Sequence, residues 1–170
     1  MMRETGRRLL GIGARARFAA YSLFEKKSSG DSNFAPGAEK YILKSPDGAL
    51  EVTVSGGRLT YSAAVGGIAV IEPSEIGLLI QGGRNIGENV TLGEPKIESC
   101  EETYRELDTE TDITDRHMNY IIPARAGKII YSLEVRIWND GFGFRLLFGE
   151  DTGLLISDAM TRFNVPDHTA

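Results

Sequence analysis

Apolar and polar residues alternate with a period of two along most of the chain after residue 40, as they do in half-buried β-strands. The alternation is clearest in two successive runs, at 50–54 and 59–65, and a third run, at 68–71, is apolar throughout. Glycine pairs at 56–57 and 66–67 separate these runs, and such pairs favour tight hairpin turns. The pattern therefore predicts a three-stranded antiparallel meander.

The second half of the chain holds the strongest strand pattern. Apolar residues recur at every second position from 129 to 137 and again from 142 to 148. Asp140-Gly141 lies between the two runs and is a typical two-residue hairpin turn. A turn there places Ile137 opposite Phe144, and the apolar faces of the two strands then coincide.

Weaker signals fill the middle of the chain. We expect short strands at 78–80 and 97–104, and a strand at 118–123 that leads to a turn at 126–127. The acidic stretch 106–115 is expected to be an exposed loop, and it lacks the glycine and terminal glutamate of a calcium-binding loop. Because no helical pattern follows residue 37, the predicted fold is an all-β, antiparallel β-sandwich.

The predicted hairpin also creates a candidate functional face. Its register sets Arg136 opposite Arg145 on the side away from the apolar face, with Trp138 nearby. Two facing arginines repel unless a carboxylate joins them, from another strand, another domain or a ligand. Tryptophan stacks on sugars and arginine donates to hydroxyls and carboxylates, so these three residues are a candidate carbohydrate or domain-interface face. The alternative is a structural layer of ion pairs between two sheets.

Charge divides the chain into two unequal parts. Residues 1–37 hold seven Lys or Arg against three Asp or Glu, whereas the chain as a whole has a net charge of −5. We expect 1–37 to be a disordered leader and linker, or the product of a start codon assigned too early, and 38–170 to be the folded domain. No signal peptide is visible, so the compartment stays open.

Composition excludes several classes of function. An acidic chain does not favour nucleic acid as a partner, and no apolar run approaches the ~20 residues that span a bilayer. One cysteine, Cys100, cannot form an internal disulfide or a Cys-rich zinc site, and two histidines, His117 and His168, are too few for most His-based metal sites. The nucleophile motifs G-x-S-x-G and S-x-x-K do not occur.

Five stretches, in order along the chain, resemble motifs of one enzyme family. They are Ser-Pro-Asp-Gly at 45–48, Glu-Pro-Ser-Glu-Ile-Gly-Leu at 72–78, Arg-His-Met-Asn at 116–119, Arg-Ile-Trp-Asn-Asp-Gly-Phe-Gly-Phe-Arg at 136–145, and Phe-Asn-Val-Pro-Asp-His-Thr-Ala at 163–170. The chain from about residue 41 resembles the N-terminal domain of glycoside hydrolase family 97, a family of α-glucosidases and α-galactosidases. It departs from the family at Ile76, where leucine is usual, and in the 116–119 stretch.

The resemblance implies a sandwich of the galactose-mutarotase-like type, here incomplete. Family enzymes continue into a (β/α)₈ barrel that carries the catalytic carboxylates, and a tryptophan normally follows the motif that ends here at Ala170. Calcium is expected in the full-length enzyme, held mainly by the barrel. The resemblance therefore transfers no catalytic residue and no metal ligand onto this chain.

The function expected from the resemblance is that of a non-catalytic N-terminal domain, or fragment, of an α-glycosidase. Such a domain packs against the catalytic barrel and shapes the carbohydrate site, so its partners are the barrel and an α-linked oligosaccharide. The alternatives are a free-standing carbohydrate-binding module and a sandwich for protein interaction without sugar affinity. The chain alone is not expected to be catalytic, and the resemblance implies export although no signal peptide is visible.

Overall fold

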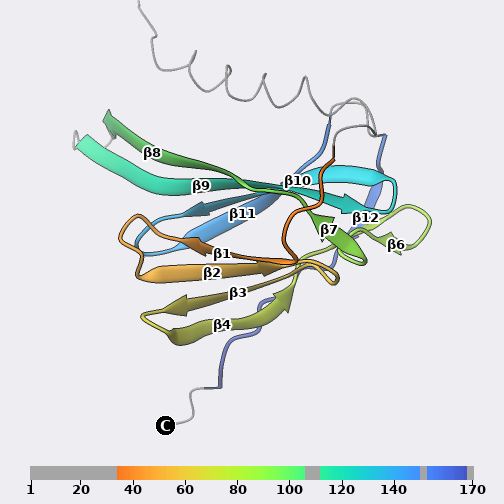
Figure 1. Cartoon of the computed structure of the whole chain (residues 1–170), viewed down its shortest axis with the longest axis horizontal. Coiled ribbons are helices and arrows are strands. Elements are labelled where there is room, and N and C mark those ends of the chain that lie inside the picture. The colour runs from red at the N-terminus through yellow and green to blue at the C-terminus, as the bar shows by residue number, and fades with distance from the viewer. Residues whose placement is uncertain (1–33, 106–111, 150–152, 168–170) are drawn as a thin grey trace, which may run out of the picture. The chain divides into compact units, whose positions relative to one another are not determined.

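The computed structural model describes residues 34–105, 112–149 and 153–167, in which all regular structure is β (Figure 1). The chain divides into two units, Met1–Ser32 and Asn33–Ala170. The first unit, and with it most of the predicted leader, lies outside the described residues. The strands are β1 (Lys40–Lys44), β2 (Leu50–Ser55), β3 (Thr60–Val65), β4 (Ile68–Glu75), β5 (Leu78–Ile80), β6 (Arg84–Asn85), β7 (Val90–Leu92), β8 (Lys96–Arg105), β9 (Asp112–Ala126), β10 (Ile129–Ile137), β11 (Phe142–Leu147) and β12 (Ile156–Ala159).

The first sheet is an antiparallel meander in the order β1-β2-β3-β4. It confirms the predicted meander and adds β1 at one edge. The turn between β3 and β4 consists of Gly66 and Gly67, whose φ angles of 57° and 83° are ones that residues with a side chain rarely adopt. Strand β4 continues through Pro73, which an edge strand tolerates because its outer side needs no N–H donor.

The second sheet has the order β11-β10-β9-β7, and β8 pairs with the other end of the long strand β9. Residues 112–115 belong to β9, so the prediction of a loop there is wrong. Their backbone pairs with β8, and the hydroxyls of Thr103 and Thr114 lie 3.2 Å apart across the two strands. The rest of the predicted loop, 106–111, lies outside the description.

The hairpin of β10 and β11 differs from the predicted register by two positions. The Trp138 N–H donates to the Gly141 carbonyl over 2.8 Å, so Asn139 and Asp140 form the turn rather than Asp140-Gly141. Val135 therefore pairs with Phe144, and Ile137 pairs with Phe142. A shift of two keeps every side chain on its predicted face but changes its partner.

A smaller third sheet, in the order β12-β5-β6, brings the end of the chain back to the first sheet. After β12 the chain runs beside β4, where the Arg162 N–H donates to the Glu75 carbonyl over 2.9 Å. Asn164 then forms an isolated bridge with Glu72. We call the described residues 153–167 the C-terminal segment.

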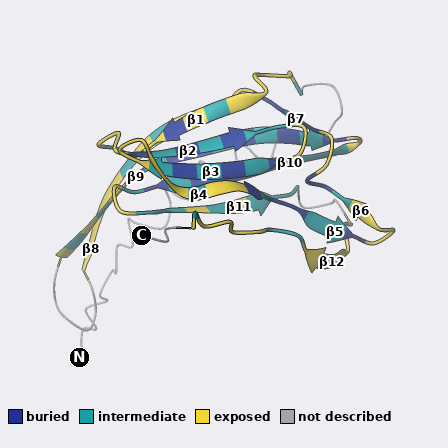
Figure 2. Ribbon diagram, turned by 90° about the horizontal axis from the view of Figure 1, so that it is seen from below, coloured by how far each residue is buried: buried dark blue, intermediate teal, exposed yellow. Residues whose placement is uncertain are grey.

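One hydrophobic core lies between the two larger sheets, which confirms the predicted sandwich. Its fully buried side chains include Val52 and Val54 from the first sheet and Ile122, Leu133 and Ile137 from the second. Burying such a side chain stabilises the fold by about 1.5–3 kcal/mol. In Figure 2 the buried residues run along the middle strands, whereas the C-terminal segment is mostly exposed.

Candidate functional site

The candidate site lies on the outer face of the second sheet, away from the core. Arg136 occupies β10 between the core residues Val135 and Ile137, so its side chain points outward. Arg145 lies on the same face of the neighbouring strand β11, and Trp138 follows the end of β10. The structure thus brings the three residues to one face, and their role in binding a carbohydrate or another domain stays a prediction.

A buried carboxylate sits between the two arginines. Glu134 is 3% exposed, and its Oε1 accepts hydrogen bonds from Nε and Nη2 of Arg136 at 3.3 and 3.0 Å. Its Oε2 accepts a short hydrogen bond from Nε of Arg145. Arg145 faces Glu134 in the ladder, whereas Arg136 faces Gly143, so the predicted pairing of two arginines is wrong. The carboxylate that joins them comes from the same strand as Arg136.

A second polar group lies beside the first. One carboxylate oxygen of Asp115 accepts a hydrogen bond from the Trp138 indole N–H over 2.6 Å and lies 2.9 Å from Nδ1 of His117. The His117 and Trp138 rings are tilted against each other with centroids 5.1 Å apart. Burial raises the pKa of Asp115, but the hydrogen bonds from Trp138 and His117 and the charge of Arg136 outweigh this and lower it.

Asn119 and Cys100 lie next to these groups in the sheet, where Asn119 pairs with Arg136 and Cys100 pairs with His117. Asn119 is buried, and its Oδ1 has no hydrogen-bond partner among the described residues. Burial raises the pKa of the Cys100 thiol, and the nearby Glu98 carboxylate raises it further. A reactive cysteine has a lowered pKa, so Cys100 is not poised to act as a nucleophile.

Most polar side chains described above on this face form hydrogen bonds or ion pairs with one another. Two charge-assisted clusters, one around Glu134 and one around Asp115, hold the arginines and the tryptophan in fixed positions. Glu134 and Asp115 are both occupied by donors, and they lie on one sheet face rather than across a cleft as glycoside hydrolysis requires. The arrangement can orient a contact surface, but it does not present an acid–base pair.

Sequence reasoning missed Glu134 and Asp115. Glu134 lies two positions before Arg136, and Asp115 lies two positions before His117, so a period of two places each pair on one face. That spacing was the available signal. For Asp115 this spacing was not considered because residues 112–115 were predicted to form a loop. For Glu134 it was not considered because the predicted register set Arg145 opposite Arg136.

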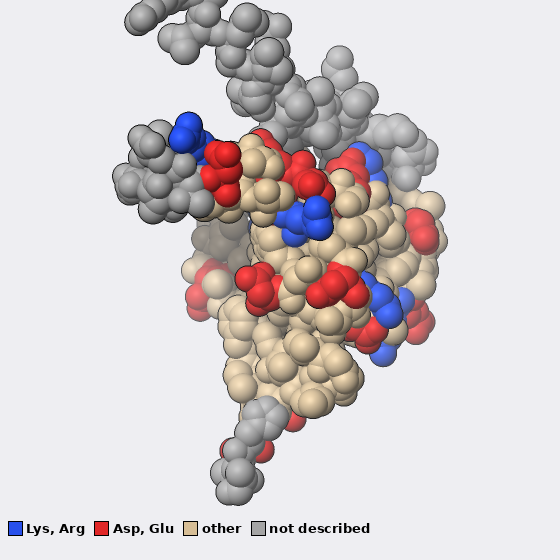
Figure 3. All heavy atoms as spheres, turned by 90° about the vertical axis from the view of Figure 1, so that its left-hand side faces the viewer, with Lys and Arg blue, Asp and Glu red and all other residues tan. Residues whose placement is uncertain are grey.

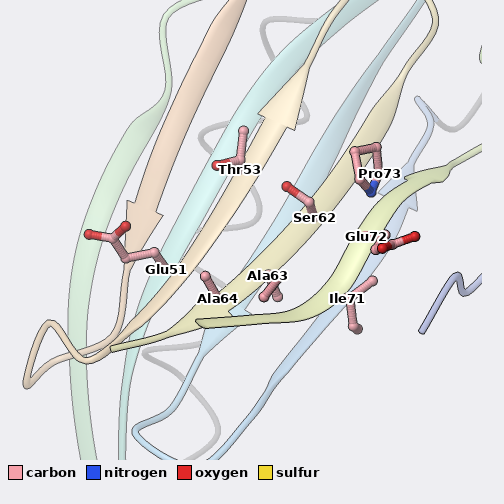
Figure 4. Close-up of a pocket in the computed structure, with 9 residues that line it drawn as sticks. Glu51, Thr53, Ser62, Ala63, Ala64, Ile71, Glu72 and Pro73 are labelled. Carbon is pink, nitrogen blue, oxygen red and sulfur yellow. The ribbon is translucent and has the colours of Figure 1, made fainter. Parts of the chain in front are cut away.

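A concave feature lies on the first sheet. A shallow hollow of about 350 Å³ crosses β2, β3 and β4. Figure 4 shows small side chains, including Thr53, Ser62 and Ala64, between the carboxylates of Glu51 and Glu72. Glu51 is already paired with Lys44 over 2.7 Å. Small side chains form the base of the hollow, so another polypeptide segment can approach the sheet closely there. None of the predicted site residues lines the hollow.

Metal ligands do not gather in the described part of the chain. No three His, Cys, Asp or Glu side chains within it are grouped closely enough to hold a metal ion. The calcium ion that the resemblance implies is expected to bind residues outside this chain, and it stays a prediction. The described residues also contain no helix that is long and apolar enough to cross a membrane.

Comparison with known proteins gives the family. The model of the glycosyl hydrolase 97 N-terminal region matches residues 43–170, nearly the whole of the folded unit. The chain belongs to glycoside hydrolase family 97.

Known family 97 proteins are much longer than the part that this chain matches. The chain is 29% identical over 110 residues to the retaining α-galactosidase of Bacteroides thetaiotaomicron. The aligned residues make up 64% of this chain and 16% of that protein. The shared fraction of the relative is thus less than a fifth of its length. The remainder of the relative has no counterpart in the residues compared.

Solved structures show the same fold. A family 97 enzyme from Pseudoalteromonas sp. strain K8, solved with acarbose, matches 75% of this chain and 20% of its own with a TM-score of 0.69 and 19% identity. A β-arabinopyranosidase matches 74% of this chain and 21% of its own with a TM-score of 0.67 and 17% identity. At these identities the likeness establishes the sandwich fold alone.

Proposed function

We propose that this chain is the non-catalytic N-terminal domain of a family 97 α-glycosidase, where it packs against the catalytic barrel and shapes the rim of the carbohydrate site. The observation that carries this proposal is the family match over 43–170 to a region that forms about a fifth of the solved relatives. The acid and base of the reaction then belong to the remaining four-fifths. The substrate class is an α-linked oligosaccharide.

The polar face supports a contact role within such an enzyme. The Glu134 cluster fixes Arg136 and Arg145 while leaving their side chains 38% and 50% exposed. Side chains that are already held in place lose little conformational entropy when a partner covers them. A pre-ordered face of this kind is suited to bind polar groups of a neighbouring domain or of a sugar at the domain boundary.

A second candidate is a carbohydrate-binding module, and one observation favours it. Arg136 gives two of its five N–H donors to Glu134, so further donors remain on the face that also carries Trp138. Arginine donors next to an aromatic ring suit the hydroxyls and apolar faces of a sugar. This candidate requires the 170-residue chain to bind sugar without a barrel.

The experiment is to read the gene beyond the codon for Ala170 and to express both the complete polypeptide and the 170-residue chain. We expect several hundred further residues, hydrolysis of 4-nitrophenyl α-galactoside or α-glucoside by the complete protein, and no hydrolysis by the 170-residue chain. Saturable binding of maltotriose or of an α-galactoside by the 170-residue chain alone favours the second candidate. A stop codon with no barrel gene beside it contradicts the proposal.

A further inference from the structure

An aromatic cluster extends from the core to the surface at one side of the sandwich. The Tyr61 side chain is 2% exposed, and its ring contacts Phe142, Phe144 and Phe163 with centroids 6.0, 5.0 and 5.9 Å away. Phe163 is nevertheless 66% exposed. We call these four residues the aromatic mouth, because the core is open to solvent there.

The outer part of the mouth is held firmly in place. The Tyr61 hydroxyl donates to the Arg162 carbonyl over 2.9 Å, and the Asn164 N–H donates to Oγ of the fully buried Ser74 over 2.8 Å. These bonds lie on both sides of Phe163 in the sequence. Phe163 and Val165, 69% exposed, are therefore ordered apolar side chains that nothing in the described chain covers.

The two edges that flank the mouth are also incomplete. Among the described residues, β11 pairs with β10 alone, and its inward-facing Phe142, Phe144 and Leu146 are only half buried. On the other side, the C-terminal segment is bonded to β4 at Glu72 and Glu75, but Ile68, at the far end of β4, is 68% exposed. An unpaired strand edge beside apolar side chains is a ready surface for another polypeptide segment.

One face of the molecule carries a broad area without charged side chains. On the face drawn in Figure 3 the charged side chains form a band across the middle and upper parts, and a broad uncharged area lies between that band and the C-terminal end. Val65 and Ile68, which pair beside the turn between β3 and β4, are both exposed. An occupant of the mouth therefore offers apolar groups to Phe163 and Val165, with Arg162 and its partner Glu75 beside them.

We propose that the aromatic mouth and its flanking edges are the docking surface for the polypeptide that follows this domain in family 97 enzymes. This inference rests on the proposed function and names where the two parts meet. The family match describes an N-terminal region and extends to residue 170, seven positions after Phe163, so the following polypeptide starts within about 25 Å of the mouth.

A short tether favours this occupant over a second copy of the chain. A segment joined to the mouth by a few residues is present there at an effective concentration in the millimolar range. A second copy has only its solution concentration. The mouth is therefore filled by the same polypeptide whenever that polypeptide is complete.

The test is a labelling footprint on the 170-residue chain and on the complete polypeptide, each at about 1 µM. In a Cys100→Ser background, Val165→Cys reports on the mouth and Ile68→Cys reports on the flanking strand β4, while Ile42→Cys, on the outer face of the first sheet, is the matched control. Ile42 is 57% exposed, similar to the reporters. Maleimide labelling of each site is followed by mass spectrometry of the peptides.

We expect both reporters to be labelled at least about 10-fold more slowly in the complete polypeptide than in the 170-residue chain, and the control to change less than about 2-fold. Equal rates in a complete polypeptide that hydrolyses α-glycosides overturn this inference and leave the proposed function standing. An inactive complete polypeptide, or a gene without one, overturns the proposed function and this inference with it. Concentration-dependent protection in the 170-residue chain alone makes a second copy the occupant and also overturns the inference.

Discussion

The polar face of the second sheet and the aromatic mouth are both exposed in part, but they differ in how far their groups are satisfied. On the polar face, Glu134 and Asp115 accept hydrogen bonds from Arg136, Arg145, His117 and Trp138, so its charges are neutralised within the domain. In the mouth, Phe163 touches the core on one side and solvent on the other. The first surface is stable uncovered, whereas the second gains free energy from a partner.

Exposure alone therefore does not identify a contact surface. Arg145 and Phe163 have comparable exposed fractions, yet the guanidinium is paired and well hydrated, whereas the phenyl ring loses nothing to desolvation when it is covered. The mouth is therefore the better candidate for docking an apolar partner, whereas the clusters of the polar face hold its own arginines and tryptophan in place. Four measurements test this difference between the two surfaces.

The largest effect is expected at Tyr61, where the mouth joins the core. Tyr61→Ala removes a buried ring that contacts three phenylalanines and should lower the free energy of unfolding of the 170-residue chain by about 3–5 kcal/mol, measured by urea denaturation. Tyr61→Phe is the matched control, because it deletes only the hydroxyl bonded to the Arg162 carbonyl and should cost about 1 kcal/mol. A loss below about 1 kcal/mol for the alanine variant would show that Tyr61 does not contribute to the stability of the hydrophobic core.

The next effect is expected on the polar face. Glu134→Gln removes the charge that joins two arginines and should cost about 2 kcal/mol in the same denaturation experiment, moderated because both guanidiniums can turn to solvent. The control is Glu98→Gln, which loses a surface pair with Lys96 and should change stability by less than about 0.5 kcal/mol. Equal effects of the two variants would show that the buried cluster is no more than a surface ion pair.

A smaller effect should appear as a dependence on pH. The pKa of Asp115 is lowered in the folded state, so its carboxylate stabilises the fold above the unfolded pKa of about 3.9, and this contribution is lost as the pH falls through the folded pKa. Asp115→Asn should therefore be less stable than the wild type at pH 7, with a difference that shrinks below about pH 4. Thermal melts across this pH range measure the difference in stability between the two proteins. A difference that does not change with pH would show that the charge of Asp115 does not stabilise the fold.

The smallest effect in the 170-residue chain is expected at Phe163. Because this side chain is 66% exposed, Phe163→Ser should cost less than about 1 kcal/mol, mainly through its edge contact with Tyr61. In the complete polypeptide the same substitution should cost about 2 kcal/mol or more, since a buried anchor would then be lost. Ile42→Ser is the control, and equal costs in the two proteins would argue against a covered mouth.

Local patterns in the sequence predict the strands, because alternation and glycine-rich turns act over a few residues. The meander of β2, β3 and β4 was predicted for this reason, and the structure confirms it. The register of β10 with β11 was not, because a shift of two leaves both apolar faces inward and pattern cannot choose between the alternatives. That choice decides whether Arg145 faces Arg136 or Glu134, so the chemistry of the site depended on it.

Other features depend on residues that are distant in sequence. The aromatic mouth needs Tyr61, β11 and the C-terminal segment together, and no local pattern links them. The resemblance to family 97 gave the sandwich, which the structure confirms, but it gave no contact between particular side chains. The exposed state of Phe163 is a property of the assembled fold and has no signature in the sequence around it.

The hydrogen bonds of the C-terminal segment also set an order of events during folding. Ser74 and Tyr61 bind partners that lie 90 and 101 positions further along the chain. A pairing over such a distance closes a long loop, and contacts of this kind are associated with slow folding. During synthesis the meander can already exist while its edge waits for residues near the end of the chain. The side of the sandwich that is last to be covered is thus also the last to be made.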